Sequence, residues 1–222
     1  TRRYRTLATY EGSPRVTDVY ASGTVAFSPT DPLVAASSSR DKSVTLRDVD
    51  TGEVHGQPLV HDGSPTAVTF SPDGRRLAVT DIGHGLYLWD IDESRLAAPV
   101  ISGKPTAVAF TSDGSRIAML DEAYNYTLWD PASGETSTER SPTRAAWPGG
   151  LDFDRTGDRV LFAGRTGHTT LLRAHDMSQI GRIMQLNGRS YCARLSPGGG
   201  LIVTTCEDGS AQLWDATTQR SV

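Results

Sequence analysis

The sequence predicts an all-β fold made of one repeated unit of short antiparallel strands. The tripeptide Leu-Trp-Asp occurs at residues 88–90, 128–130 and 213–215. Five alternating apolar runs repeat at spacings of 43, 40, 43 and 42 residues, and they end at Phe27, Phe70, Phe110, Phe153 and Leu195. Each run continues into a short polar turn and a second alternating run, a pattern typical of strands with one buried face.

The expected strands follow in the same order in every repeat. The first two are joined by a turn such as SPDG at 71–74, where Pro fixes φ and Gly supplies the positive φ that enters the second strand. The third strand carries the Leu-Trp-Asp run or its counterpart. A fourth strand is expected near 58–61, 99–102, 136–140 and 180–186. No segment has the pattern of a long amphipathic helix.

Four short antiparallel strands at a period near 42 residues predict a β-propeller blade. We number the five repeats blades 1 to 5 in chain order. The run FSPDG with LWD at this spacing resembles the WD-repeat β-propeller family over about residues 7–222. The resemblance implies one domain over residues 1–222 with five four-stranded blades, and it leaves open whether these close a ring or form an arc of a larger one. The segment RTLATYEG at 5–12 resembles an outer strand that clasps the last blade.

The resemblance also assigns structural residues. WD repeats share a hydrogen-bonded set of His before the first strand, Ser or Thr in the second, Asp in the next turn and Trp in the third. The residues here that match this set are Asp41, His61, Trp89, Trp129, Asp208 and Trp214. Gly83 and Ala123 occupy expected Asp positions, and Arg47 and Arg173 occupy expected Trp positions, so no blade keeps all four groups.

Composition excludes several classes of protein. The net charge of −4 is a poor match for a nucleic-acid backbone, and no 18-residue apolar run predicts a membrane span. Two cysteines make no disulfide framework, so we expect a cytoplasmic protein. The 22 basic residues include twenty Arg and two Lys, which indicates a GC-rich bacterial genome.

Catalytic and metal-binding motifs are not evident. The five histidines and two cysteines lack the spacing of zinc ligands, and DFDRTGD at 152–158 aligns with the ordinary hairpin turn rather than a calcium loop. No G-x-S-x-G, P-loop or H-E-x-x-H motif occurs. We therefore expect neither an enzyme nor a metal or cofactor site.

Binding is expected on the face that carries the loops before each first strand and the turns between second and third strands, where the family usually binds partners. The candidate partner-binding residues are Arg40, Lys104, Glu122, Tyr124, Trp147, Arg189 and Glu207. A loop Trp is typical of binding hot spots, although Trp147 equally fits a plug between blades 3 and 4.

The sequence therefore predicts a non-catalytic scaffold or sensor module that binds a protein partner or other domains of its parent chain. It resembles the C-terminal parts of bacterial signalling proteins that carry a STAND-type ATPase or a Ser/Thr kinase. The alternative is an enzyme or small-ligand receptor that uses the central channel. The innermost strands are mostly apolar, apart from Asp152 and Arg194, which disfavours that alternative.

Overall fold

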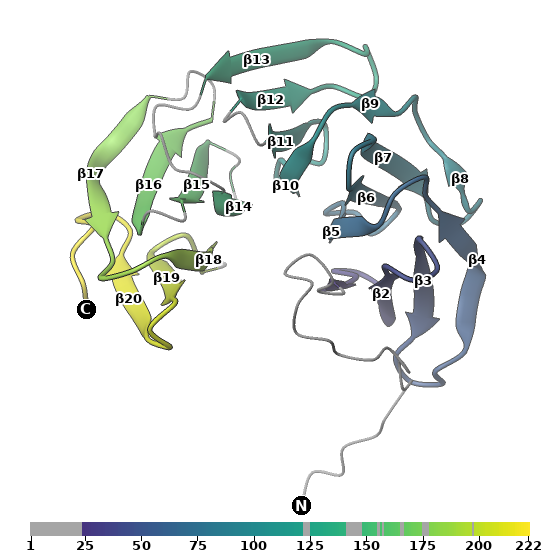
Figure 1. Ribbon diagram of the computed structural model, residues 1–222, viewed down its shortest axis with the longest axis horizontal. Helices are drawn as coiled ribbons and strands as arrows, with labels where there is room; N and C mark the ends of the chain where they lie inside the picture. The colour runs from purple at the N-terminus through teal and green to yellow at the C-terminus, as the bar shows by residue number, and fades with distance from the viewer. Residues whose placement is uncertain are drawn as a thin grey trace, which may run out of the picture. The chain divides into compact units, whose positions relative to one another are not determined.

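The computed structural model describes residues 24–121, 125–140, 148–154, 156, 158–164, 167–174, 178–196 and 198–222. In these ranges all the regular secondary structure is β-strand, arranged in five antiparallel sheets, which confirms the predicted fold class. The chain divides into two compact units, Thr1–Gly103 and Lys104–Val222. Figure 1 shows each sheet as successive strands joined by short connections.

The first unit holds two sheets. One has the order β1 (Val25–Phe27), β2 (Leu33–Ser38), β3 (Ser43–Asp48) and β4 (Val54–Val60). The other contains β5 (Pro65–Phe70), β6 (Arg76–Asp81) and β7 (Gly85–Asp90). Its outer position is shared by β8 (Arg95–Leu96) and β9 (Ile101–Ser102), which both pair with β7. The single outer strand expected near 99–102 is therefore split in two.

The second unit holds three sheets. The first contains β10 (Pro105–Phe110), β11 (Ile117–Asp121), β12 (Asn125–Trp129) and β13 (Thr136–Arg140). The next contains β14 (Pro148–Phe153), β15 (Arg159–Gly164), β16 (His168–Arg173) and β17 (Gln179–Gln185). The last has three strands, β18 (Ser190–Leu195), β19 (Leu201–Cys206) and β20 (Ala211–Asp215). Strand β14 lies against both β10 and β18 (Figure 1).

The repeat period read from the sequence is the period of the sheets. The five anchor residues are the last residues of the five innermost strands, β1, β5, β10, β14 and β18. The turn after β5 matches its expected chemistry, because Gly74 has φ 73° and its N–H donates to Ser71 O at 2.9 Å. A residue with a Cβ rarely adopts that φ, which explains the glycine.

Each unit has its core between neighbouring sheets. In the first unit Val44, Leu46 and Leu59 pack with Leu77 and Trp89 of the next sheet. The second unit has two such cores, one around Leu120, Phe162 and Leu172 and one around Leu171, Ile202 and Trp214. A fully buried Leu contributes about 1.5–3 kcal/mol relative to an exposed one, so these contacts dominate the stability of each unit.

Two outer strands are fastened to the next sheet by the same device. Gly56 in β4 and Gly181 in β17 both have φ 66° and lie at irregularities in strand pairing. A Cβ on either glycine would overlap the side chain of Ser94 or Gln219, respectively. The N–H that follows each glycine donates to that same side chain, to Ser94 Oγ at 3.3 Å and to Gln219 Oε1 at 2.9 Å. We call this contact the outer clasp.

The outer clasp makes a first prediction. Replacing Gln219 with Ala leaves the Arg182 N–H without its acceptor and removes the bond from Gln219 Nε2 to Ala216 O. We expect the free energy of unfolding to fall by about 1–2 kcal/mol, measured by urea denaturation. Thr217→Ala changes an exposed residue of the same turn and serves as the control. Equal losses in the two variants would show that the clasp contributes nothing specific.

Candidate functional site

The connections between strands gather at two ends of each sheet. We call loop end the one that carries the loops before the first strands and the turns between second and third strands. In the first unit it comprises residues 39–42, 61–64 and 82–84. Ser64 Oγ donates to Ser39 O at 3.3 Å, the His61 N–H donates to Lys42 O at 2.8 Å, and Lys42 Nζ donates to Asp62 O at 2.9 Å. These bonds hold the loops of neighbouring sheets together.

Asp81 is the centre of this loop end. Its buried carboxylate accepts the Gly63 N–H at 2.8 Å, the Gly85 N–H at 2.9 Å and the His84 N–H at 3.2 Å. Bonds to a charged acceptor are stronger than those between neutral groups. A Cβ on Gly63 would overlap Ile82 O, so the loop approaches the turn this closely only because residue 63 is glycine. Asp81 thus fixes the loop at 61–64 against the turn at 82–84.

Aromatic side chains support the loop end from below. The His61 side chain, 4 % exposed, meets Tyr87 and Trp89 edge-on, at ring-centroid distances of 4.6 and 5.5 Å. Burial lowers the pKa of His61 to about 4, so the ring is neutral near pH 7. Among the described residues, neither ring nitrogen of His61 nor Nε1 of Trp89 has a hydrogen-bond partner. The expected hydrogen-bonded pair is therefore replaced in this blade by aromatic packing.

A tyrosine joins this cluster to the exposed loop. Tyr87 Oη donates to Asp62 Oδ2 at 3.0 Å. Desolvation, with this bond, raises the pKa of Tyr87 to about 12, which keeps its hydroxyl protonated as a donor. The exposed Asp62 is held by Tyr87 and Lys42 together.

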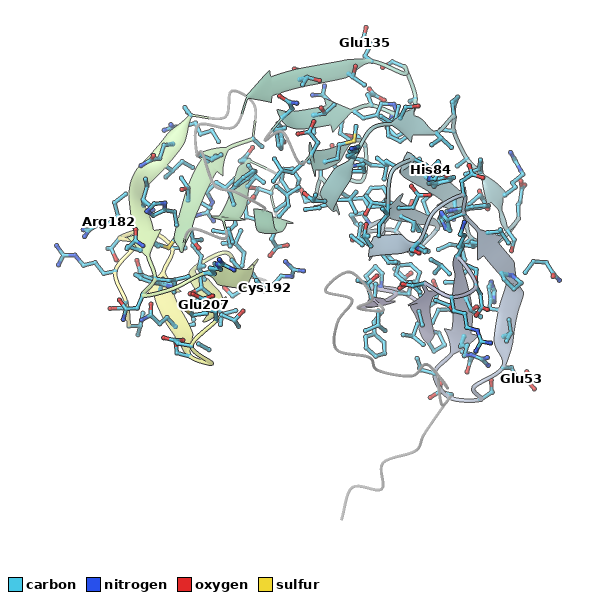
Figure 2. The ribbon with its side chains drawn as sticks, viewed as in Figure 1. Glu53, His84, Glu135, Arg182, Cys192 and Glu207 are labelled. Carbon is cyan, nitrogen blue, oxygen red and sulfur yellow. The ribbon has the colours of Figure 1, made fainter. Side chains whose placement is uncertain are left out.

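Charged and apolar groups are exposed on this platform. Arg40 and Asp41 are exposed in the turn between β2 and β3, and Asp41 Oδ2 accepts the Ser38 hydroxyl at 2.7 Å. Ile82 is 46 % exposed, and the exposed His84 follows two residues later (Figure 2). The sequence marked this turn as part of the binding face but gave no signal for Ile82 or His84, whose residue types are ordinary in turns.

The second unit brings two predicted residues together at its own loop end. Arg189 Nε and Glu207 Oε2 are 3.7 Å apart, and the Glu207 N–H donates to Arg189 O at 2.9 Å. Both side chains are largely exposed, and Figure 2 shows Glu207 near the connection from β19 to β20. Exposed ion pairs contribute little to stability, so the pair remains available to a partner. Lys104 is exposed just before β10. Glu122, Tyr124 and Trp147 lie outside the described residues.

The tryptophans of the third strands are all buried, but they differ in hydrogen bonding. Trp214 Nε1 donates to Thr204 Oγ1 at 2.9 Å. Trp214 pairs with Ile202, so the hydroxyl stands two residues beyond the paired residue. Val79 and Met119 stand at that position beside Trp89 and Trp129. Only the blade 5 tryptophan therefore has a hydroxyl partner at this position.

The expected aspartate positions need correction. Gly83 and Ala123 were aligned with the turn aspartate, and the loss of its bonds was inferred. Asp81 and Asp121, two residues earlier, do this work at the ends of β6 and β11. Asp121 accepts the Asn125 N–H at 2.8 Å, as Asp81 accepts the N–H of Gly85. Asp208 is exposed and accepts the Ser210 N–H at 2.8 Å, a bond that lowers the pKa of its carboxyl.

The expected tryptophan position in blade 4 was also wrong. Leu172 pairs with Val160 as Trp214 pairs with Ile202, so Leu172 and not Arg173 is the counterpart of the tryptophan. Leu172 is fully buried, whereas Arg173 is exposed. An aliphatic side chain thus replaces the ring in the core, and no arginine has to be accommodated there.

The polar residues of the innermost strands in the second unit do not make a reactive group. Asp152 Oδ2 accepts the Leu195 N–H of the next sheet at 2.7 Å. Burial raises the pKa of this carboxyl, against which that bond and nearby Arg194 act. Arg194 is exposed and donates to Ala193 O at 3.0 Å. Asp152 therefore links two sheets.

Two further searches concern ions and membranes. Within the described ranges, no three His, Cys, Asp or Glu side chains are grouped so that they would hold a metal ion. The same residues contain no helix of the length and apolarity needed to cross a membrane.

These features define a repeat protein whose consecutive antiparallel sheets present connecting loops for binding. The family model of the WD domain, G-beta repeat, matches residues 4–48, 55–90 and 181–215. These segments cover just over half of the chain, which belongs to the WD40 repeat family. Such repeats generally mediate protein–protein interaction or scaffolding and are typically non-catalytic. No match is found among the curated proteins.

The tryptophan bond gives a reciprocal prediction. Thr204→Val leaves the buried Trp214 N–H unpaired, so we expect the free energy of unfolding to fall by about 1–2 kcal/mol. Val79→Thr places a hydroxyl at the same position beside Trp89, whose N–H has no partner among the described residues. It should be neutral or stabilising by up to about 1 kcal/mol. Urea denaturation of both variants measures this, and a loss of more than about 1 kcal/mol in the second would refute the equivalence.

A second prediction concerns Asp81. Asp81→Ala removes the acceptor of three backbone N–H groups, and we expect a loss of about 2–4 kcal/mol in the free energy of unfolding. Hydrogen exchange should accelerate at Gly63, His84 and Gly85 before it does so in β6. Asp41→Ala, at an exposed carboxylate on the same platform, is the control and should leave these amides unchanged.

Proposed function

We propose that this chain is a non-catalytic protein-interaction module and that the loop end of its first unit is a partner-binding surface. The observation that carries the proposal is the bonding of three connections around Asp81, with Arg40, Ile82 and His84 exposed above it. A surface held in one conformation loses little entropy on binding, so its contacts contribute more of their energy to affinity.

The chemistry of this loop end suits a protein partner. Ile82 offers an apolar contact on a fixed turn. Arg40 lies at the neighbouring turn and no bond to its side chain is found among the described residues, so its guanidinium can receive a partner's carboxylate in a forked pair. Mixed apolar and charged groups on a rigid frame are typical of protein interfaces. In the second unit, Arg189 and Glu207 offer a further charged pair.

The setting that we propose is a larger bacterial signalling protein in the cytoplasm. The excess of Arg over Lys supports a bacterial origin, and the divergence of the repeats resembles the arrays attached to STAND-type ATPases or kinases. In that setting the module senses a partner or holds an effector domain of the same polypeptide. Trp147 remains a second candidate contact.

A small-ligand receptor or enzyme is the alternative. It requires titratable side chains that are free at the innermost strands. In the second unit Asp152 is engaged by the Leu195 N–H, which leaves less for chemistry. A metabolite retained by the purified chain, or turnover on a substrate panel, would favour the alternative.

The interaction surface is tested by a charge reversal. The partner is first isolated by cross-linking to the immobilised chain and identified by mass spectrometry. Arg40→Glu should then weaken its binding at least about tenfold by calorimetry, because an attractive charge becomes repulsive. Arg75→Glu makes the same change at the opposite end of the unit, where Thr30 Oγ1 donates to Asp73 O at 3.4 Å. Equal losses in the two variants would place the contact elsewhere.

A further inference from the structure

The sheet β18–β19–β20 has an incomplete outer side among the described residues. Strand β20 pairs with β19 on one side, and on the other side a single bridge joins Trp214 to Ser221. The Asp215 N–H donates to Arg220 O at 2.9 Å, and the Val222 N–H donates to Leu213 O at 2.9 Å. A fourth strand is thus begun by residues 220–222, while the part of β20 at Ala211 is unpaired on that side within the described residues.

The first sheet shows how such a strand continues. The Asp48 N–H donates to Glu53 O at 3.0 Å, just as the Asp215 N–H donates to Arg220 O. The strand then passes through the bulge at Gly56 and places Leu59 opposite Val44. The Leu59 side chain is buried in the core.

The fourth sheet repeats this arrangement in the second unit. The Arg173 N–H donates to Ser178 O at 2.8 Å, Gly181 forms the bulge, and Met184 lies opposite Thr169. Met184 is buried in the same core cluster as Leu171. Both outer strands therefore read Gly-x-x-aliphatic after the bulge, as GQPL at 56–59 and GRIM at 181–184.

The last sheet carries the surface on which that aliphatic residue would pack. By the shared register, Ala211 is the counterpart of Val44 and Thr169. Val203 and Leu213, which pair with each other, are 40 % and 41 % exposed. Their counterparts in the fourth sheet, Leu161 and Leu171, pair in the same way and are buried. An apolar pair of this exposure is typical of a surface that lacks its cover.

We infer that β20 accepts an extended strand of a partner polypeptide, antiparallel to it, with the pattern Gly-x-x-Leu or Gly-x-x-Met. The strand continues the outer row begun by residues 220–222. The backbone groups of Ala211 and the N–H of Leu213 supply its hydrogen bonds, and the aliphatic side chain covers Val203 and Leu213. This is strand addition at a sheet edge, in which backbone bonds give affinity and one side-chain position gives specificity. It is independent of the proposed loop-end surface.

The chain itself supplies the probes. Acetylated and amidated peptides of residues 56–64 (GQPLVHDGS) and 181–189 (GRIMQLNGR) start at the glycine and so need not displace residues 220–222. We expect saturable binding to the chain by calorimetry and slower hydrogen exchange at Ala211 and Leu213. Leu59→Asp or Gly56→Val in the first peptide should weaken binding at least about tenfold, and neither change affects the fold of the chain. Val203→Asp in the chain should do the same.

Three results would overturn the inference. One is no binding by either peptide. Another is binding that is indifferent to Leu59→Asp, because this residue sets the proposed register. The third is full protection of the Ala211 amide before any peptide is added, which would show that the chain fills its own edge, for example with residues 1–23.

Discussion

The burial of one sheet face against the next is the constraint on which the rest of this structure depends. Second and third strands place aliphatic residues on both faces, as Leu161 and Phe162 do in β15, and both are almost fully buried. Such contacts contribute several times the net free energy of a single hydrogen bond. The sheets therefore keep their form where the hydrogen-bonded residues of the family are lost, as at Leu172 in blade 4.

Polar bonds have a narrower role, because they position connections rather than hold sheets. Asp81 fixes one loop to one turn, and Asp121 fixes the turn of its own sheet through Asn125. Trp214 bonds Thr204 within one sheet, whereas Trp89 retains its packing without such a bond. These local contacts can change from blade to blade while the sheets persist, which explains how the repeats diverge so far in sequence.

The sequence was sufficient for the features that repeat and insufficient for those that depend on contact. Alternation and turn glycines predicted the strands, and the anchors fall at the ends of the innermost strands. The role of Asp81 could not be read because alignment counts residues, whereas the carboxylate reaches across to Gly63 in another connection. Arg173 was misplaced by one residue for the same reason, since pairing defines the position. The outer clasp joins residues 38 positions apart, Gly56 and Ser94, and leaves no local pattern.

Loop ends and sheet edges make different demands on a partner. A loop end is recognised through side chains such as Arg40 and Ile82, which vary freely because the sheets do not depend on them. A sheet edge is recognised mostly through the backbone, which every sequence shares, so its selectivity must come from the few positions where the strand meets a bulge or an apolar pair. The glycines at 56 and 181 and the pair Val203–Leu213 are such positions. A repeat fold of this kind can therefore change its loop-end specificity by single substitutions, whereas its edge specificity is tied to the geometry that builds the sheets.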